Sequence, residues 1–172
     1  MTVTNKRESA LAYIKTNILP PINGTGNFAN NLKKISREYY IPTELRDDEF
    51  PMVSIVDDDT TLYTPLTNEE YTVGADEQSI LSGFPILLIG YTKRKHLGDH
   101  DDAGSLSTAM NNLTSDILIA MMKDTTLGDN VLSVALFSIA HSLIYMDNNI
   151  GVVIHKYILK YDFDPTGANP SI

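Results

Sequence analysis

The chain has 172 residues and a mass of 19.1 kDa, which is the size of one compact domain. Hydrophobic residues make up 42% of it and charged residues 20%, so the composition indicates a folded protein and excludes a disordered one. A net charge of −9 opposes sequence-specific binding to nucleic-acid phosphates, and the absence of cysteine excludes disulfides, thiolate zinc sites and cysteine nucleophiles.

The first half of the chain predicts one helix and two strands. Leu11, Ile14 and Ile18 recur at helical spacing, and the helix they predict ends at two successive prolines. Residues 32–40 and 52–56 are rich in β-branched and aromatic or apolar side chains, which favours strands. Residues 57–77 are acidic and polar, so we expect a long surface excursion there.

The second half predicts a buried strand, a long helix and a hairpin. Residues 80–95 contain a near-continuous apolar run at 86–91, which favours a strand covered on both faces, and Pro85 predicts a bulge or a late strand start. Ser105 is placed to cap a helix that extends to about Lys123. Residues 131–146 and 150–163 predict an antiparallel hairpin, and residues 164–172 a frayed or partner-docked tail.

These elements predict a single domain over residues 1–172 with an α+β fold. Its sheet is expected to be mainly antiparallel, with a long C-terminal β-hairpin, and to be flanked by the N-terminal helix and one central amphipathic helix. Polar or charged residues interrupt the early apolar run and no segment stays apolar for the length of a span, so we expect no signal peptide and no membrane contact.

The last predicted strand has two apolar faces. Because side chains alternate along a strand, Ile150, Val152, Ile154 and Ile158 share one face. The other face carries Val153, Tyr157, Leu159, Tyr161 and Phe163. The helices of the same chain can cover one face, whereas a neighbouring subunit or further helices of the chain must cover the other. Val153, Tyr157, Tyr161 and Phe163 are therefore candidate interface residues.

The stretch "HLGDHDDAG" is the densest group of potential metal ligands. His96 and His100 have i, i+4 spacing, but Gly98 and Gly104 argue against the helix that would align them. Asp99, Asp101 and Asp102 lack the spacing of a calcium loop. The sequence favours a solvated connection whose carboxylates lie near the start of the next helix, and we expect no metal ion and no cofactor.

Lys93, Arg94 and Lys95 immediately precede this acidic stretch. A basic segment followed by an acidic one can pair with its counterpart on an adjacent copy of the chain, so both segments are candidate interface elements. The alternative is a solvated strand end.

Two histidines, His141 and His155, are nearly equidistant from the predicted hairpin turn and can meet across it, either as a metal or pH-sensing pair or as ordinary sheet residues. The chain contains no nucleophile elbow, Walker A loop or H-E-x-x-H pair, and we expect no enzyme activity.

The order of elements resembles the tail terminator, or tail completion, proteins of tailed bacteriophages. The resemblance is carried by "ALAYIKTNI", "FPMVSIVD", "PILLIGYTKR", "LSTAMNNLTSDILIAMMKDTTLG" and "VVIHKYILKYDFDP". These segments span most of the chain, and the acidic excursion at 57–77 departs from shorter members of the family.

The resemblance implies a structural virion protein at the junction of tail and neck, made in the host cytoplasm. Members form a homohexameric ring that caps the tail tube, ends its polymerisation and joins it to the head connector. The implied partners are the tail tube protein, the head-neck connector and, as a further candidate, the sheath protein, while genomic DNA passes through the lumen without specific binding. The alternatives are another neck or head-completion protein, or a small metal-dependent hydrolase using His96, Asp99 and His100.

Overall fold

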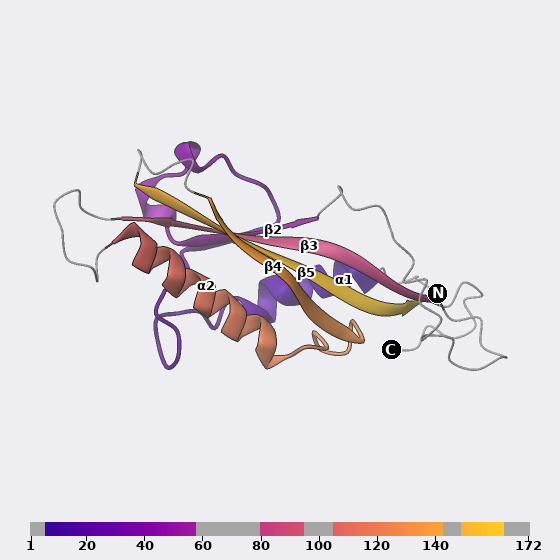
Figure 1. Cartoon of the computed structure of the whole chain (residues 1–172). Coiled ribbons are helices and arrows are strands. Elements are labelled where there is room, and N and C mark those ends of the chain that lie inside the picture. Colours follow the sequence, from indigo (N-terminus) through magenta and orange to yellow (C-terminus); the bar gives the residue numbers. More distant parts are fainter. Residues whose placement is uncertain (1–5, 58–79, 95–104, 143–148, 164–172) are drawn as a thin grey trace.

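The computed structural model describes residues 6–57, 80–94, 105–142 and 149–163. In these residues a five-stranded sheet carries the two α-helices on one of its faces (Figure 1). The expected α+β fold with a mainly antiparallel sheet and a C-terminal hairpin is therefore confirmed. The predicted excursion beyond Asp57, the loop around His96 and the C-terminal tail lie outside the described residues.

Both predicted helices form where the apolar spacing places them. Helix α1, Lys6–Tyr13, continues into a π-helical turn, Ile14–Ile18, and together they bury Leu11, Ile14 and Ile18. Helix α2, Leu106–Lys123, begins at Ser105, whose hydroxyl accepts a hydrogen bond from the backbone N–H of Thr108 at 3.1 Å. None of the helices that the structure describes is long and apolar enough to cross a bilayer.

The strands follow the order β1-β2-β3-β5-β4 across the sheet. Only β1 and β2 run parallel, and every other neighbouring pair is antiparallel. The strands are β1 Lys34–Ser36, β2 Met52–Asp57, β3 Ile80–Lys93, β4 Ser133–Ser142 and β5 Ile150–Phe163. The longest pairing joins β3 to β5 over the whole length of both strands, so these two form the centre of the sheet.

Two local expectations are wrong. The strand predicted over residues 32–40 is limited to Lys34–Ser36. After Ser36 the chain leaves the sheet and packs Tyr40 against the sheet face that lies opposite the helices. Pro85 introduces no bulge, and pairs with Ile158 in unbroken register. Among the described residues β2 ends opposite Ile86, so no described strand lies beside Pro85 on that side of β3. Proline is tolerated in a strand where no partner needs its N–H.

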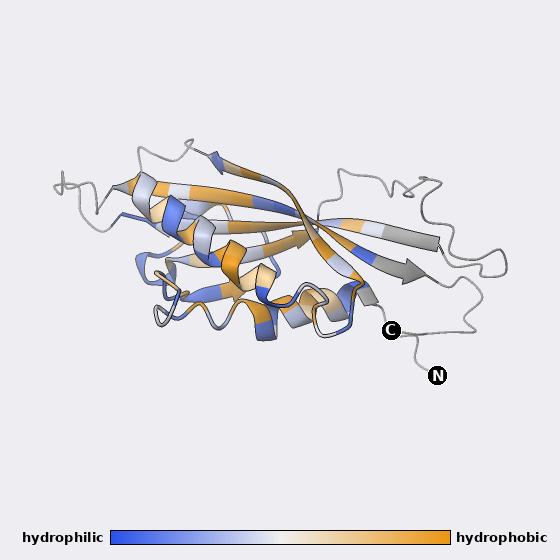
Figure 2. Cartoon of the chain, turned by 60° about the horizontal axis from the view of Figure 1, so that its bottom comes forward, coloured by the Kyte–Doolittle hydropathy of each residue, from blue (hydrophilic) through white to orange (hydrophobic). Residues whose placement is uncertain are grey.

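A hydrophobic core lies on each face of the sheet. The larger core joins α1, the π-helical turn and α2 to the inward residues of β2, β3 and β5. The smaller core lies on the opposite face, where the segment between β1 and β2 covers Ile150, Val152 and Tyr91 with Leu45 and Phe50. Hydrophobic colour runs along much of the central strands in Figure 2. The alternation within β5 is confirmed, and the chain covers much of both faces itself.

Candidate interaction surface on strand β4

The predicted interface residues of β5 do not face outward. Val153 and Tyr157 are fully buried in the larger core, so the expectation that they contact a neighbouring subunit is corrected here. The physical reason is that β5 lies inside the sheet beneath α2, which covers the face that these side chains share. Tyr161 and Phe163 lie at the end of β5, and only their backbone pairing with β3 is described.

The basic segment is partly neutralised inside the chain. The ammonium group of Lys93 forms an ion pair with Asp47, and it also lies 5.9 Å from the centre of the Phe50 ring. The backbone N–H of Arg94 donates a hydrogen bond to the carbonyl oxygen of Asn149 at 3.0 Å, which closes the end of the β3–β5 pair. The remaining candidates, Lys95, Asp99, Asp101 and Asp102, lie outside the described residues.

Strand β4 is an edge strand with an open side. In the described part of the chain it pairs with β5 only, so the backbone N–H and C=O groups on its other side have no strand partner. Such an edge is a ready template for pairing with another chain, and natural proteins usually protect it with charged residues or proline. Residues 131–142 contain neither Lys, Arg, Asp, Glu nor Pro, so no such protection is present on this strand.

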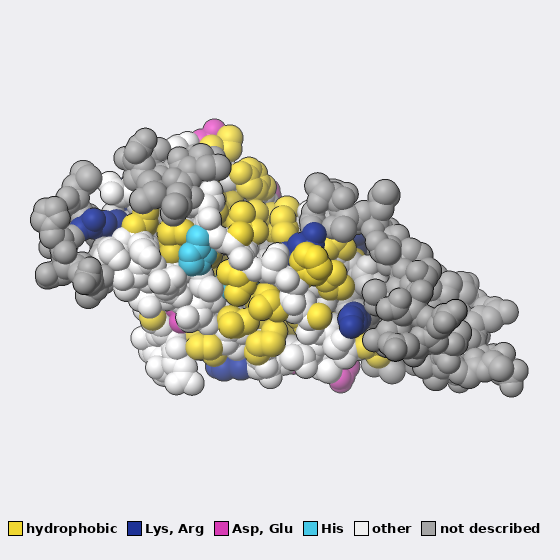
Figure 3. Space-filling view, in the orientation of Figure 1, with side chains coloured by type: hydrophobic (Ala, Val, Ile, Leu, Met, Phe, Trp, Pro, Cys, Tyr) yellow, Lys and Arg dark blue, Asp and Glu magenta, His cyan; other side chains and the backbone are white. Residues whose placement is uncertain are grey.

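Large apolar side chains are exposed on and beside this edge. Figure 3 shows hydrophobic side chains gathered over β4 and α2 on one face of the molecule. We name them the β4 patch; its members are Met122, Leu132, Leu136, Phe137 and Ile139, which are 41%, 41%, 39%, 67% and 38% exposed. Of the seven large hydrophobic residues that are exposed in the described chain, these five share one region.

The strand register places most of the patch on the helix side of the sheet. Leu136 pairs with Tyr157 and Ile139 pairs with His155, and both partners point toward the helices. A register shift between Leu136 and Ser138 leaves Phe137 as the extra residue of a β-bulge. The Phe137 ring turns to the opposite face, where the ammonium group of Lys156 lies 5.2 Å from its centre.

A hydrogen bond fixes β4 against α2. The hydroxyl of Thr114 and Nε2 of His141 are 2.9 Å apart, which joins the outer end of β4 to the middle of the helix. Leu118 and Met122 follow Thr114 at i+4 and i+8, so they continue the same side of α2 along the strand. The patch is therefore a fixed surface shared by one strand and one helix.

The two histidines of the hairpin lie diagonally across it rather than directly opposite each other. His141 pairs with Val153, and His155 pairs with Ile139. His155 is fully buried, with Nδ1 3.2 Å from the Tyr157 hydroxyl. Burial, with a smaller contribution from the charge of His141, lowers the pKa of His155 to about 4, and burial raises the pKa of Tyr157. Both groups are therefore neutral near pH 7 and act as packing residues.

We also searched the described residues for a metal site. The described residues contain no group of three His, Asp or Glu side chains able to hold a metal ion. The exposed residues of β4 were not predicted from the sequence, because alternation along β5 assigned both apolar faces of the hairpin to that strand. The available signal was the uncharged run at 131–142, but its meaning depends on which hairpin strand forms the edge of the sheet.

No protein-family model and no curated protein matches this sequence.

Proposed function

We propose that this protein is a structural subunit that assembles through strand β4 into a closed ring, and that the ring serves as the tail terminator of a tailed bacteriophage. The ring caps the tail tube, ends its polymerisation and offers its other surface to the head connector. The ring rests on β4, and the phage role rests on the resemblance of the element order to that family.

The single observation that carries the assembly is the open, apolar edge of a well-packed domain. The larger core encloses Leu11, Tyr157 and Ile117 with no exposed surface, so the chain does not lack the means to bury apolar groups. It nevertheless leaves Phe137 67% exposed on an edge strand. Exposed apolar patches on soluble proteins commonly mark contact surfaces, and an edge strand without charged residues or proline can add backbone hydrogen bonds to such a contact.

Burial of this surface is large enough to support assembly. Covering the remaining exposed parts of Leu136, Phe137 and Ile139 contributes on the order of 3 kcal/mol per contact from apolar area alone. Hydrogen bonds to the backbone groups on the open side of β4 add to this. A ring repeats the contact at every subunit boundary, so closure stabilises each copy on two sides.

The net charge of the chain agrees with a protein that surrounds DNA without binding it. A net charge of −9 repels phosphates, so acidic residues toward a lumen would let DNA pass without adhering. Under this proposal the tail tube protein and the head connector bind the two flat sides of the ring, with the sheath protein as a further candidate. The proposed role needs no cofactor and no catalytic step.

Native mass spectrometry and negative-stain electron microscopy of the purified chain test the ring directly. We expect a hexamer that appears as an annulus with a central hole. Phe137→Asp places a charge in the centre of the contact and should shift the protein toward monomer. Asn27→Asp adds the same charge on an exposed position of the loop between α1 and β1, and should leave the ring intact.

The phage role needs a second measurement. Purified rings added to polymerising tail tube protein from the same source should shorten the tubes and appear at one end of each tube. Phe137→Asp protein should leave tube length unchanged. A wild-type chain that stays monomeric at high concentration would refute the ring, and rings that never attach to tubes would refute the tail terminator role.

A further inference from the structure

A second exposed surface follows β1, the strand at the other end of the sheet order. After β1 the chain presents Tyr39 and Ile41, which are 60% and 45% exposed and are the two large exposed hydrophobics outside the β4 patch in the described chain. Two exposed carboxylates, Glu38 and Glu44, flank them. We name these four residues the β1-edge surface.

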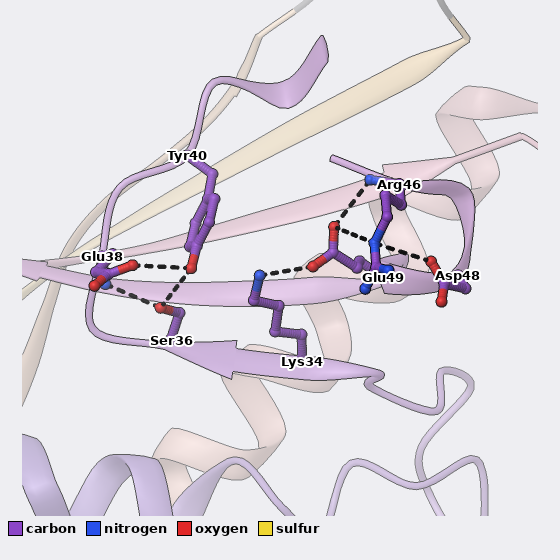
Figure 4. A network of polar contacts seen from close by, with 7 residues as sticks. All are labelled: Lys34, Ser36, Glu38, Tyr40, Arg46, Asp48 and Glu49. Carbon is purple, nitrogen blue, oxygen red and sulfur yellow. Dashed lines mark hydrogen bonds and ion pairs between the residues drawn. The ribbon is translucent and has the colours of Figure 1, made fainter. Parts of the chain in front are cut away.

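The β1-edge surface is held in place from beneath. The Tyr40 hydroxyl donates a hydrogen bond to Glu38 at 3.0 Å, and its backbone carbonyl accepts one from the Tyr91 hydroxyl at 3.1 Å. The ammonium group of Lys34 lies 4.1 Å from the centre of the Tyr40 ring and pairs with Glu49 at 2.7 Å. Figure 4 shows the Tyr40–Glu38 and Lys34–Glu49 contacts, which extend from β1 to the short 3₁₀ helix Asp47–Glu49 before β2. The surface is therefore ordered by the fold of its own chain.

The β1-edge surface is acidic. Residues 38–49 contain five carboxylates and one arginine. Three of the carboxylates pair with Lys34, Lys93 or Arg46 inside the chain. Among the described residues, no ion pair forms at Glu38 or Glu44, so these two carboxylates remain as uncompensated charge beside Tyr39 and Ile41.

The β4 edge carries the opposite charge. Lys156 and Lys160 lie on β5 directly beside Ser138 and Ser133 of β4, on the face of the sheet toward which Phe137 turns. The strand itself has no charged residue between positions 131 and 142, and Asp129 in the preceding turn is the nearest carboxylate along the chain. This edge therefore combines apolar side chains with ammonium groups, whereas the β1 edge combines apolar side chains with carboxylates.

We propose that the β4 patch of one copy docks against the β1-edge surface of the next copy, with Lys160 facing Glu38 and Glu44. This inference rests on the proposed ring and names its contact. The β4 patch adjoins the last strand of the sheet order, whereas the β1-edge surface follows β1, the first strand, so the contact joins two different surfaces. A contact between two different surfaces repeats head to tail and closes into a ring when its rotation fits. A two-fold contact of β4 with β4 would instead bring the lysines of both copies together.

Cysteine crosslinking tests the contact cleanly, because the chain contains no cysteine of its own. Ser138→Cys and Thr43→Cys introduce thiols at exposed positions next to the two surfaces and leave every apolar residue of both surfaces in place. With a short bismaleimide reagent, the double variant should give a ladder of crosslinked species that ends at the ring size. Each single variant should stay uncrosslinked, and an equal mixture of the two single variants should stop at crosslinked dimers.

A charge exchange provides an independent test. Glu38→Lys combined with Glu44→Lys should weaken association roughly tenfold, because like charges then meet across the contact. Adding Lys160→Glu to this variant should restore much of the loss. Lys15→Glu, on the exposed side of the π-helical turn, is the matched control and should restore nothing.

The possible outcomes separate this contact from the ring itself. Crosslinking of Ser138→Cys protein alone would show that β4 meets β4 and would overturn the inference. Native hexamers that give no ladder from the double variant, or a charge exchange without rescue, would also overturn it while the ring proposal stands. Wild-type protein that stays monomeric would refute both the ring and the contact between the two surfaces.

Discussion

The buried histidine of β5 predicts that the domain becomes less stable in mildly acidic solution. His155 has no exposed surface, and its Nε2 has no hydrogen-bond partner in the described structure. Its pKa is about 4 in the folded chain, against an ordinary value of 6.5. Between these values the unfolded chain binds more protons than the folded one, so the free energy of unfolding falls as the pH is lowered.

The size of the effect follows from the two pKa values. The stabilising contribution of neutral His155 is complete above pH 6.5 and is lost as the pH falls toward 4. Each pKa unit corresponds to about 1.4 kcal/mol, which gives a loss of about 2 kcal/mol between pH 7.5 and pH 5.0. Glu49 and Asp124 also have lowered pKa values, but from ordinary values of 4.5 and 3.8, so their contributions are lost below this interval.

Urea denaturation at several pH values measures this loss. The protein should be diluted until its unfolding midpoint no longer depends on concentration, because assembly would add its own stabilisation. His155→Gln should remove most of the pH dependence even if its overall stability is lower, whereas His141→Gln should retain it. Equal pH dependence in wild-type and His155→Gln protein would refute the reasoning.

Three further substitutions test the packing and the surface by urea denaturation under the same conditions. Asp116→Ala should cost roughly 2–4 kcal/mol, because the buried carboxylate accepts hydrogen bonds from the backbone of Ala29 and from the backbone and side chain of Asn30; a loss below about 1 kcal/mol would contradict this. Gly90→Ala should cost roughly 1–3 kcal/mol, because its Cβ would lie 2.8 Å from Leu113 of α2, and an unchanged midpoint would show that the helix can shift. Phe137→Ser should change the free energy of unfolding of the monomer by less than about 0.5 kcal/mol. A larger loss would show that the aromatic side chain of Phe137 belongs to the core of its own chain.

The sequence predicts elements well where the signal is local. Helix α2 has a capping serine and apolar residues at a regular helical period, and both features act within a few residues of each other. The hairpin likewise follows from two strand-like runs that are close in sequence. The length of β1 could not be predicted in this way, because Tyr40 leaves the sheet to reach Tyr91, which is 51 positions away in the sequence.

The candidate surface depends on information that no local pattern contains. Alternation along β5 correctly separates its two faces, but Val153 and Tyr157 become core residues because α1, α2 and β5 meet in space. Phe137 becomes exposed because β4 is the outer strand of the hairpin and carries a bulge at that position. Strand order and the bulge arise from contacts across the whole sheet, so composition alone cannot distinguish an apolar edge from an apolar centre.

The unequal strand lengths give the sheet a gradient of protection along its long axis. At residues 86–91 of β3 the central pair β3–β5 has β2 on one side and β4 on the other. At Ile80–Ser82 and Tyr161–Phe163 the two strands have only each other within the described chain. A ribbon of two strands is marginal by itself. Transient opening would therefore begin at that projecting end and proceed inward, so amide hydrogens near Leu88 would exchange with solvent far more slowly than those near Leu81.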